Sequence, residues 1–413
     1  MLQSVLPLLL GLLLLVQGST SFQAFGILRR IDVEKRVLHV FSNGQERMVP
    51  LAREARILNK EGKPLAGALQ APELAAGAEI TVTVERGDAG PQIAVIRLGR
   101  QPLPGALMPR TSVGLKPLSE MSASDRYKGE DGGLYGGGSN APPPALREAA
   151  RKEAARIAPL DAEGRPSPAG AIGLVSISMS NATQEFSMFK QIADRDPRKS
   201  ERLTIVDCAQ GGQAMAQWVD PQGRAWLEAD RRLQAAGVSP KQVQVAWVKL
   251  ANMGPRGELT EHGKKLESDT RAVLQNARLR FPNLRIAYLG SRIYGGYAGT
   301  PLNPEPYAYE SAFVVRWLIQ AQSRGDAELN ANPERGDVRS ALLLWGPYFW
   351  SDGVTPRKSD ALIWERADLT EDGTHPSQTG RRKVADMLLK FFVTDETAAP
   401  WFARSVGKGG TGD

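Results

Sequence analysis

The sequence predicts an α/β fold: a three-layer α/β/α sandwich with a parallel sheet, preceded by a small all-β barrel. From residue 171 onward, continuous apolar runs alternate with helical stretches, which is typical of parallel strands that are buried on both faces. Short alternating segments separated by turn residues fill residues 23–100, which is typical of a small barrel. At 413 residues with 42% hydrophobic content, the chain can form two or three domains.

The first 21 residues have the pattern of a secretory signal peptide. Leu6 to Val16 is an unbroken apolar run, and small residues follow at Gly18 and Ser21. No Lys or Arg precedes the run, so a retained N-terminal anchor is the alternative, although the run is short for a membrane span. We therefore expect a secreted or periplasmic protein with no integral membrane segment once the signal is removed. Cys208 is the only cysteine, which excludes an intramolecular disulfide and a cysteine-based metal site.

Residues 22–100 are predicted to form the barrel domain. Its first three strands are expected at Phe25 to Ile31, Val37 to Phe41 and Arg47 to Leu51, with Asn43-Gly44 as the strongest hairpin signal. Two more strands are expected at residues 79–85 and 93–98. No group of catalytic residue types falls in this domain, so we expect a spacer or stabilising module, with a sugar- or wall-binding role as the alternative.

Residues 101–165 change in composition and are predicted to be a Gly/Pro-rich linker with a short helix from Ala145 to Ile157. Such a segment cannot supply its own core, and the alternative is a long loop laid over the next domain. Residues 166–395 are predicted to form the α/β domain, and residues 396–413 a C-terminal tail.

The α/β domain is predicted from five buried strands and five helices that alternate along the chain. In a parallel sheet of this kind the ligand lies beyond the carboxyl ends of the strands. The strands are expected at residues 171–177, 203–209, 243–250, 284–289 and 341–345, and the helices at 185–192, 225–236, 263–280, 307–320 and 377–392.

Histidine is scarce, which narrows the search for a general base. Of the three histidines, His39 lies in a predicted barrel strand and His262 at the start of a polar helix, where we expect it to be solvated. His375 remains, three residues after Asp372 in the sequence Asp-Gly-Thr-His-Pro. A carboxylate at this spacing can accept the imidazole N–H and leave the other nitrogen free as a base. In the alternative interpretation, Asp372 and Ser377 only cap the last helix.

Residues suited to acyl transfer follow successive predicted strands. Ser178-Met179-Ser180 follows the first strand, Gly212 the second and Asn252 the third. A hydroxyl activated by a base can attack a carbonyl, and amide N–H groups can stabilise the oxyanion that forms. Each residue also has a simpler interpretation, since Gly212 could serve only a tight turn and Asn252 only a cap.

In this order, the residues resemble the motifs of the SGNH (GDSL-type) hydrolase superfamily over about residues 170–393. The resemblance implies a flavodoxin-like sandwich in which Ser180 is the nucleophile, His375 the base and Asp372 its partner. It also implies that the N–H groups of Ser180 and Gly212 and the side chain of Asn252 bind the oxyanion. The pattern departs from the family at two positions, where Met179 and Met253 replace the usual polar residues, and Ser178 is a rival nucleophile.

Aromatic residues on two later loops are candidates for substrate binding. Tyr294 and Tyr297 follow the fourth predicted strand, and Tyr348 and Trp350 follow the fifth. They could stack on sugar rings or surround an acyl group, or they could simply pack the loops. No metal-ligand spacing and no cofactor motif stand out, so we predict neither a metal nor a cofactor. The net charge of +7 is spread without a basic stripe, which does not favour nucleic-acid binding.

These observations predict an exported serine esterase, a carboxylic ester hydrolase that removes acyl groups through a Ser-His-Asp triad. Acetyl is the first candidate for the acyl group, and a glycan is a candidate for the alcohol. The alternative is a non-catalytic envelope protein that binds a glycan on the same sandwich. The sequence makes no prediction of the oligomeric state.

Overall fold

The structure is a computed structural model that describes residues 21–42, 45–87, 90–99, 101 and 109–404. The chain divides into two compact units, residues 1–106 and 107–413. All of the predicted signal peptide except Ser21 lies outside the described residues, and so does the predicted Asn43-Gly44 turn.

The first unit contains a closed five-stranded barrel with the strand order β1-β2-β3-β5-β4. The barrel closes because β1 pairs antiparallel with both β2 and β4, while β3 and β5 pair in parallel. Its core includes Leu38, Val40, Ile80 and Ile96, and His39 lies on β2 between two of these buried residues. The strands are β1 Ser21–Asp32, β2 Val37–Ser42, β3 Gln45–Leu58, β4 Glu79–Gly87 and β5 Gly90–Leu98, with short 3₁₀ helices at Ala68–Gln70 and Pro72–Leu74.

The second unit is built on a five-stranded sheet in the order β10-β9-β8-β6-β7, in which every pair is parallel. All residues of four of the strands are buried, which explains why their sequences are apolar without alternation. The chain places β7 on one side of β6 and β8 on the other, so the direction in which strands are added reverses between them. Sheets of this kind bind ligands at such a switch point, here at the carboxyl ends of β6 and β8. The strands are β6 Ile172–Ile177, β7 Leu203–Val206, β8 Val243–Lys249, β9 Ile286–Gly290 and β10 Leu342–Trp345.

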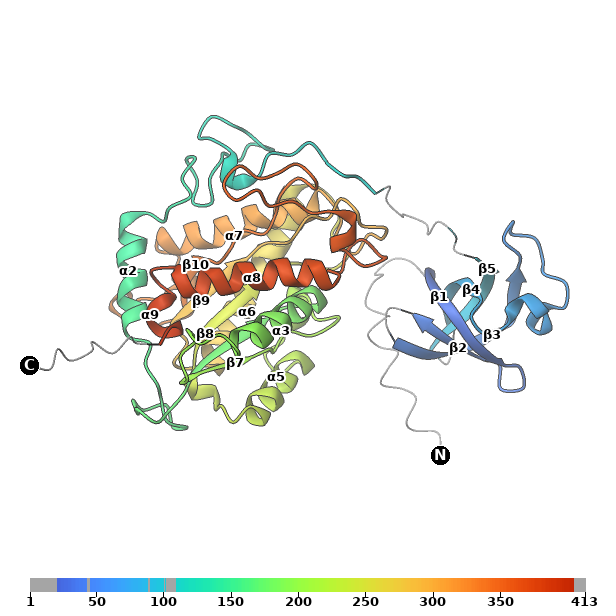
Figure 1. The fold of residues 1–413 in the computed structure, drawn as a ribbon, viewed down its shortest axis with the longest axis horizontal. Helices are drawn as coiled ribbons and strands as arrows, with labels where there is room; N and C mark the ends of the chain where they lie inside the picture. The colour runs from blue at the N-terminus through green and yellow to red at the C-terminus, as the bar shows by residue number, and fades with distance from the viewer. Residues whose placement is uncertain (1–20, 43–44, 88–89, 100, 102–108, 405–413) are drawn as a thin grey trace, which may run out of the picture. The chain divides into compact units, whose positions relative to one another are not determined.

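Helices cover both faces of this sheet, as right-handed crossovers require. The helices α3 and α8 run side by side over one face, and α6 packs against α7 (Figure 1). The longer helices are α2 Pro144–Ala155, α3 Ser180–Ala193, α5 Arg224–Ala235, α6 Lys264–Arg280, α7 Tyr307–Ser323 and α8 Gln378–Thr394. The short helices are α4 Met215–Trp218, α9 Ala399–Phe402, the π-helix η5 Leu259–Gly263, and 3₁₀ turns at Leu118–Glu120, Pro240–Gln242, Ala327–Leu329, Pro333–Arg335 and Arg366–Asp368.

Residues 109–143, which we call the cover segment, are part of the second unit and pack against its later elements. They do not form the predicted linker. The side chain of Leu118 is fully buried in the core of this unit, and its N–H donates to the hydroxyl of Tyr348 (3.1 Å). Arg316 of α7 donates to the carbonyl of Asp131 (2.8 Å). Partners on later elements thus satisfy backbone groups that a Gly/Pro-rich segment cannot pair internally. The alternative interpretation, a long loop laid over the next domain, describes this segment.

The C-terminal boundary also differs from the prediction. Residues 396–404 belong to the second unit, because Trp401 and Phe402 are buried and their rings pack against Phe392 of α8. The carbonyl of Phe402 also accepts the N–H of Ser200 (2.8 Å). The remainder of the predicted tail, residues 405–413, lies outside the described residues.

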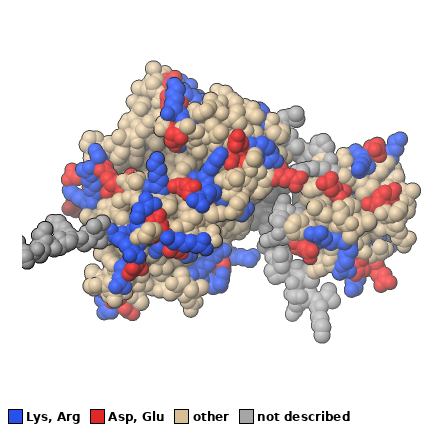
Figure 2. All heavy atoms as spheres, in the orientation of Figure 1, with Lys and Arg blue, Asp and Glu red and all other residues tan. Residues whose placement is uncertain are grey.

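Acidic and basic side chains alternate over the face of the molecule in Figure 2, which agrees with the charge pattern of the sequence. Across the part of the chain that the structure describes, no helix combines the length and the apolar character needed to cross a bilayer.

Candidate active site

Ser180 is the first residue of α3 and lies just beyond the carboxyl end of β6. Its Oγ lies 2.8 Å from Nε2 of His375. The rival nucleophile, Ser178, is fully buried, and its hydroxyl donates to the carbonyl of Lys249. Of the two serines, only Ser180 is therefore placed to exchange a proton with an imidazole.

His375 lies between Ser180 and a carboxylate. Its Nδ1 lies 2.5 Å from Oδ2 of Asp372, and Oδ1 of Asp372 accepts the N–H groups of Thr374 and His375 (both 2.9 Å). Burial alone would raise the pKa of the Asp372 carboxyl, but the hydrogen bond and charge of His375, together with these N–H groups, hold it well below its ordinary value. An ionised Asp372 fixes the imidazole with hydrogen on Nδ1, which leaves the Nε2 lone pair facing Ser180.

The alternative interpretation of this loop, a simple helix cap, does not describe Asp372. Ser377 is the N-cap residue of α8 and accepts the N–H of Gly380. Asp372 instead accepts hydrogen bonds within its own loop, including one from the hydroxyl of Thr370 (2.9 Å). The cap and the carboxylate–imidazole pair are thus separate features of the same segment.

The backbone N–H groups of Ser180 and Gly212 are candidates for binding an oxyanion. Gly212 has φ +75°, a conformation that favours glycine, and open space surrounds the position where a Cβ would be. No hydrogen bond within residues 109–404 engages its N–H. The N–H of Ser180 is one of the free donors at the start of α3, where the helix dipole also favours negative charge. These two groups have the chemistry that an oxyanion site needs.

Asn252 is held firmly, and only part of its amide remains available. Its Oδ1 accepts the N–H of Ala216 (3.0 Å), and its Nδ2 donates to Oδ2 of Asp269 (2.7 Å). One of the two Nδ2 hydrogens is thus committed to α6, which leaves the second for a ligand. The role of Asp269 could not be predicted from the sequence, because this residue lies seventeen residues after Asn252 and no local motif links the two.

Asn252→Ala is expected to lower kcat for ester hydrolysis by about 10² to 10³-fold, the effect of removing one oxyanion donor. Asp269→Ala serves as the control, because it removes the anchor and leaves the amide in place, and its effect should be smaller. Kinetics and thermal melting of both variants check this. Unchanged turnover with a lowered melting temperature in Asn252→Ala would make Asn252 a structural residue only.

The two methionines that depart from the family pattern meet in the structure. Met179 is buried in a small apolar cluster with Ala214 and Ala251, separate from the main core, and Met253 packs against this cluster. The two positions are next to Ser180 and Asn252 in the chain. The apolar residues therefore pack against one another and need no polar partner at these two positions.

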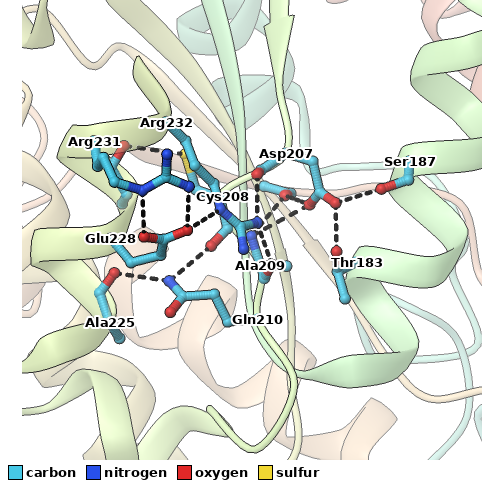
Figure 3. A network of polar contacts seen from close by, with 12 residues as sticks. Thr183, Ser187, Asp207, Cys208, Ala209, Gln210, Ala225, Glu228, Arg231 and Arg232 are labelled. Carbon is cyan, nitrogen blue, oxygen red and sulfur yellow. Dashed lines mark hydrogen bonds and ion pairs between the residues drawn. The ribbon is translucent and has the colours of Figure 1, made fainter. Parts of the chain in front are cut away.

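A partly buried carboxylate, Asp207, ties α3 to the sheet (Figure 3). It follows β7 and accepts the hydroxyls of Ser176 on β6 (2.5 Å) and of Thr183 and Ser187 on α3 (2.5 and 2.6 Å). Burial raises the pKa of this carboxyl, although the hydroxyls act against the shift. Since Thr183 lies one turn after Ser180, these bonds fix the helix that carries the nucleophile.

This network could not be predicted from the sequence, because serine and threonine in a helix give no signal of a partner beyond a distant strand. Figure 3 also shows Arg232 beside it, which donates to the carbonyls of Asp207 and Ala209 (2.8 and 2.9 Å). Cys208 is buried, and burial raises the pKa of its thiol, so its environment is that of a packed core residue. Asn181, also missed, donates to the carbonyl of Thr374 (2.8 Å) and joins α3 to the histidine loop.

The four aromatic residues predicted to bind substrate are buried, which corrects that prediction. Tyr294 and Tyr297 are 1% and 2% exposed, and Tyr348 and Trp350 are 6% and 0% exposed. Their polar atoms bond within the protein: the hydroxyl of Tyr294 donates to the carbonyl of Arg110 (2.9 Å), for example. Side chains packed in this way offer no ring face to a sugar, and the alternative interpretation of loop packing describes them.

His262 is also not the solvated residue that the sequence suggests. It lies in the π-helix η5, is 8% exposed, and bonds through Nε2 to the carboxylate of Glu310 on α7. Glu310 also accepts the hydroxyl of Tyr127 (2.6 Å) and lies 2.8 Å from the ammonium of Lys128. His262 therefore helps to hold the cover segment in place. It is not part of the hydrogen-bonded chain that links Ser180, His375 and Asp372.

Comparison with known proteins gives distant similarities only. No family model matches the chain, and no curated protein matches it. Among solved structures, the chain is similar to a Bacteroides fragilis protein provisionally described as an acylhydrolase (10% identity, 60% of this chain and 96% of that chain, TM-score 0.33). It is also similar to the periplasmic domain of a Salmonella Paratyphi A lipopolysaccharide acetyltransferase (13% identity, 61% and 97%, TM-score 0.30). Apo-CusF from Escherichia coli matches 21% of this chain and 95% of its own at 8% identity, with a TM-score of 0.16. At these values the similarities carry no argument about function.

Proposed function

We propose that the second unit is a serine hydrolase of carboxylic esters. The observation that supports this most directly is the continuous hydrogen-bonded chain Ser180–His375–Asp372 at the carboxyl edge of the parallel sheet. A hydroxyl, an imidazole and an ionised carboxylate in this order are the elements of general-base activation of a nucleophile.

In the proposed reaction, Nε2 of His375 takes the proton of Ser180 as Oγ attacks the ester carbonyl. Asp372 stabilises the imidazolium that forms. The oxyanion is bound by the N–H groups of Ser180 and Gly212 and by the free amide hydrogen of Asn252. His375 then returns the proton to the departing alcohol, and water repeats the sequence on the acyl-serine to release the acid.

The rest of the proposal concerns setting and substrate. We propose that the protein is exported, because its first 21 residues have the pattern of a signal peptide. An acetyl ester is the proposed substrate, and Met253, which is partly exposed and adjoins Asn252 in the chain, is the candidate contact for its methyl group. A glycan is still the proposed alcohol. The four candidate aromatic residues are buried, so they do not supply a surface on which its sugar rings could stack.

The direct experiment is covalent labelling with a fluorophosphonate. We expect one label per chain, carried by Ser180 and lost in Ser180→Ala, because only an activated hydroxyl reacts at a useful rate. Ser187→Ala is a matched control, since Ser187 lies on the same helix as Ser180 and its hydroxyl donates to Asp207. Absence of label in folded protein would favour the non-catalytic binding protein.

The second unit is expected to hydrolyse a small ester without the barrel. A chain that begins at Leu107 keeps the triad, the oxyanion donors and the whole cover segment described above. Its kcat/KM for a soluble acetyl ester should stay within about threefold of that of the full chain, because no group of the proposed site lies in residues 1–106. Circular dichroism and cooperative melting establish that it folds. A folded but inactive shortened chain would assign part of the site to the barrel.

A further inference from the structure

Arg292 is a buried arginine that takes no part in the proposed proton transfers or in oxyanion binding. It is the second residue after β9, at the edge of the sheet where the triad lies, and it is 3% exposed. No hydrogen bond or ion pair joins its guanidinium to any residue that the structure describes, and its Nε is buried without a partner. A buried guanidinium carries a charge and five N–H donors, and leaving them unpaired is costly.

Three carboxylates act on the guanidinium electrostatically, those of Glu185, Glu305 and Asp372. Each of them is engaged elsewhere. Glu185 pairs with Lys249, Asp372 with His375, and Glu305 accepts the indole N–H of Trp350 (2.7 Å). Burial lowers the pKa of Arg292, and the three carboxylates act against this shift without occupying the donors of the guanidinium.

The loop that Arg292 begins forms a border of the proposed active site. The N–H of Gly299 donates to the carbonyl of Asp372 (2.9 Å), and Nδ2 of Asn303 donates to the carbonyl of Asn252 (3.1 Å). The loop thus joins the segment that carries the base to the segment that carries the amide. Arg292 is held at the start of this connection, and Asp372 lies within its electrostatic range.

Neighbouring polar atoms are also without partners. The hydroxyls of Ser291, beside Arg292, and of Thr374, beside His375, are buried and have no hydrogen-bond partner among the described residues. Buried hydroxyls and guanidinium groups are normally satisfied. The unsatisfied donors at this edge of the sheet are therefore open to a bound group or to water.

We propose that Arg292 binds an anionic group of the substrate, a carboxylate in the first instance, so that the ester cleaved at Ser180 is an anionic one. The guanidinium presents parallel N–H groups that match the two oxygens of a carboxylate, and such bidentate pairs are strong and directional. A water molecule could occupy some of the donors, but it supplies no charge. The inference rests on the proposed esterase function and adds its substrate class.

The test compares two pairs of esters, each made of an anionic and a neutral compound of similar size. In one pair the charge lies on the acyl side (4-nitrophenyl hemisuccinate and butyrate), and in the other on the alcohol side (4-acetoxybenzoate and 4-acetoxybenzamide). In at least one pair, the parent protein should prefer the anionic ester by about tenfold or more in kcat/KM, as expected for a charge-assisted bidentate contact. A ratio near one in both pairs would overturn the proposal, and this comparison needs no variant.

Variants then assign the preference to the residue. Arg292→Gln should bring the ratio to about one, and Arg292→Lys should keep part of it, since the charge remains and the fork is lost. Arg324→Gln, an exposed arginine at the end of α7, should leave the ratio unchanged. A folded Arg292→Gln protein that keeps the full preference would also overturn the proposal.

The proposed anion site and the proposed esterase activity can be disproved independently of each other. If the parent cleaves none of the four esters, the proposed function fails, and binding decides the role of Arg292. Benzoate should then raise the melting temperature of the parent more than benzamide does, and this difference should disappear in Arg292→Gln. Equal effects of benzoate and benzamide on the parent would overturn the anion site as well.

Discussion

Replacing Ser180 by alanine is expected to reduce kcat for a soluble acetyl ester by about 10⁴-fold or more, as in triads whose members act together. The reason is geometric, because the Ser180 hydroxyl lies 2.8 Å from Nε2 of His375. Ser180 is only partly buried, so the loss of one oxygen should leave the melting temperature close to that of the parent. Steady-state kinetics and thermal melting of the purified variant check both statements.

Ser178→Ala is the matched control for this experiment. Ser178 is two residues earlier and fully buried, and its hydroxyl donates to the carbonyl of Lys249. Its removal should destabilise the protein by about 1–3 kcal/mol, because a buried acceptor loses its donor, and should leave kcat within about tenfold. The reverse outcome, an inactive Ser178→Ala and an active Ser180→Ala, would exclude Ser180 as the nucleophile.

Asp372→Asn is expected to lower kcat by about 10³ to 10⁴-fold, because an amide can hold the wrong imidazole tautomer and cannot stabilise an imidazolium. It should also change the acid stability. The pKa of Asp372 in the folded protein is depressed, so its contribution to stability is present above the unfolded value of about 4 and is lost as the pH falls through the folded pKa. The parent should therefore be more stable than Asp372→Asn at neutral pH, by a margin that shrinks at acid pH.

Urea unfolding of both proteins from neutral pH down to about pH 3 measures this margin. A margin that grows on acidification would mean that the carboxyl is not ionised in the folded state. Parental activity in Asp372→Asn, with the fold intact, would show that His375 needs no carboxylate and would remove Asp372 from the proposed triad.

The part of the site that the sequence predicts is the part encoded locally. Asp372 and His375 are three residues apart in one loop, and histidine is scarce, so their pairing in the structure follows from a short stretch of chain. The parallel sheet is likewise encoded in apolar runs, and the ends of its strands necessarily meet at one edge. Ser180 follows β6 at this edge, and its hydroxyl meets His375 there.

The parts that the sequence does not predict depend on distant partners. The burial of Tyr294 and Tyr348 follows from the cover segment, because Arg110 and Leu118 meet them from more than 180 residues away in the chain. Asp207 is a lone carboxylate until Ser176 and Thr183 are brought to it. Which of Ser178 and Ser180 faces the histidine depends on where the strand ends, and the sequence does not define that point. Since β6 ends at Ile177 and α3 begins at Ser180, strand alternation does not govern either side chain.

The cover segment has a consequence for the order in which the chain can fold. The carboxylate of Asp352 accepts the N–H groups of Val113 (2.7 Å) and Gly114 (3.1 Å), which precede it by more than 230 residues. During synthesis the cover segment therefore emerges early, and its hydrogen bonds to Asp352 cannot form until the loop after β10 has been made. Contacts of such long sequence separation form late and slow folding. A nascent chain that stops before Tyr348 lacks both Asp352 and the hydroxyl that accepts the N–H of Leu118, so the docking of the cover segment is incomplete.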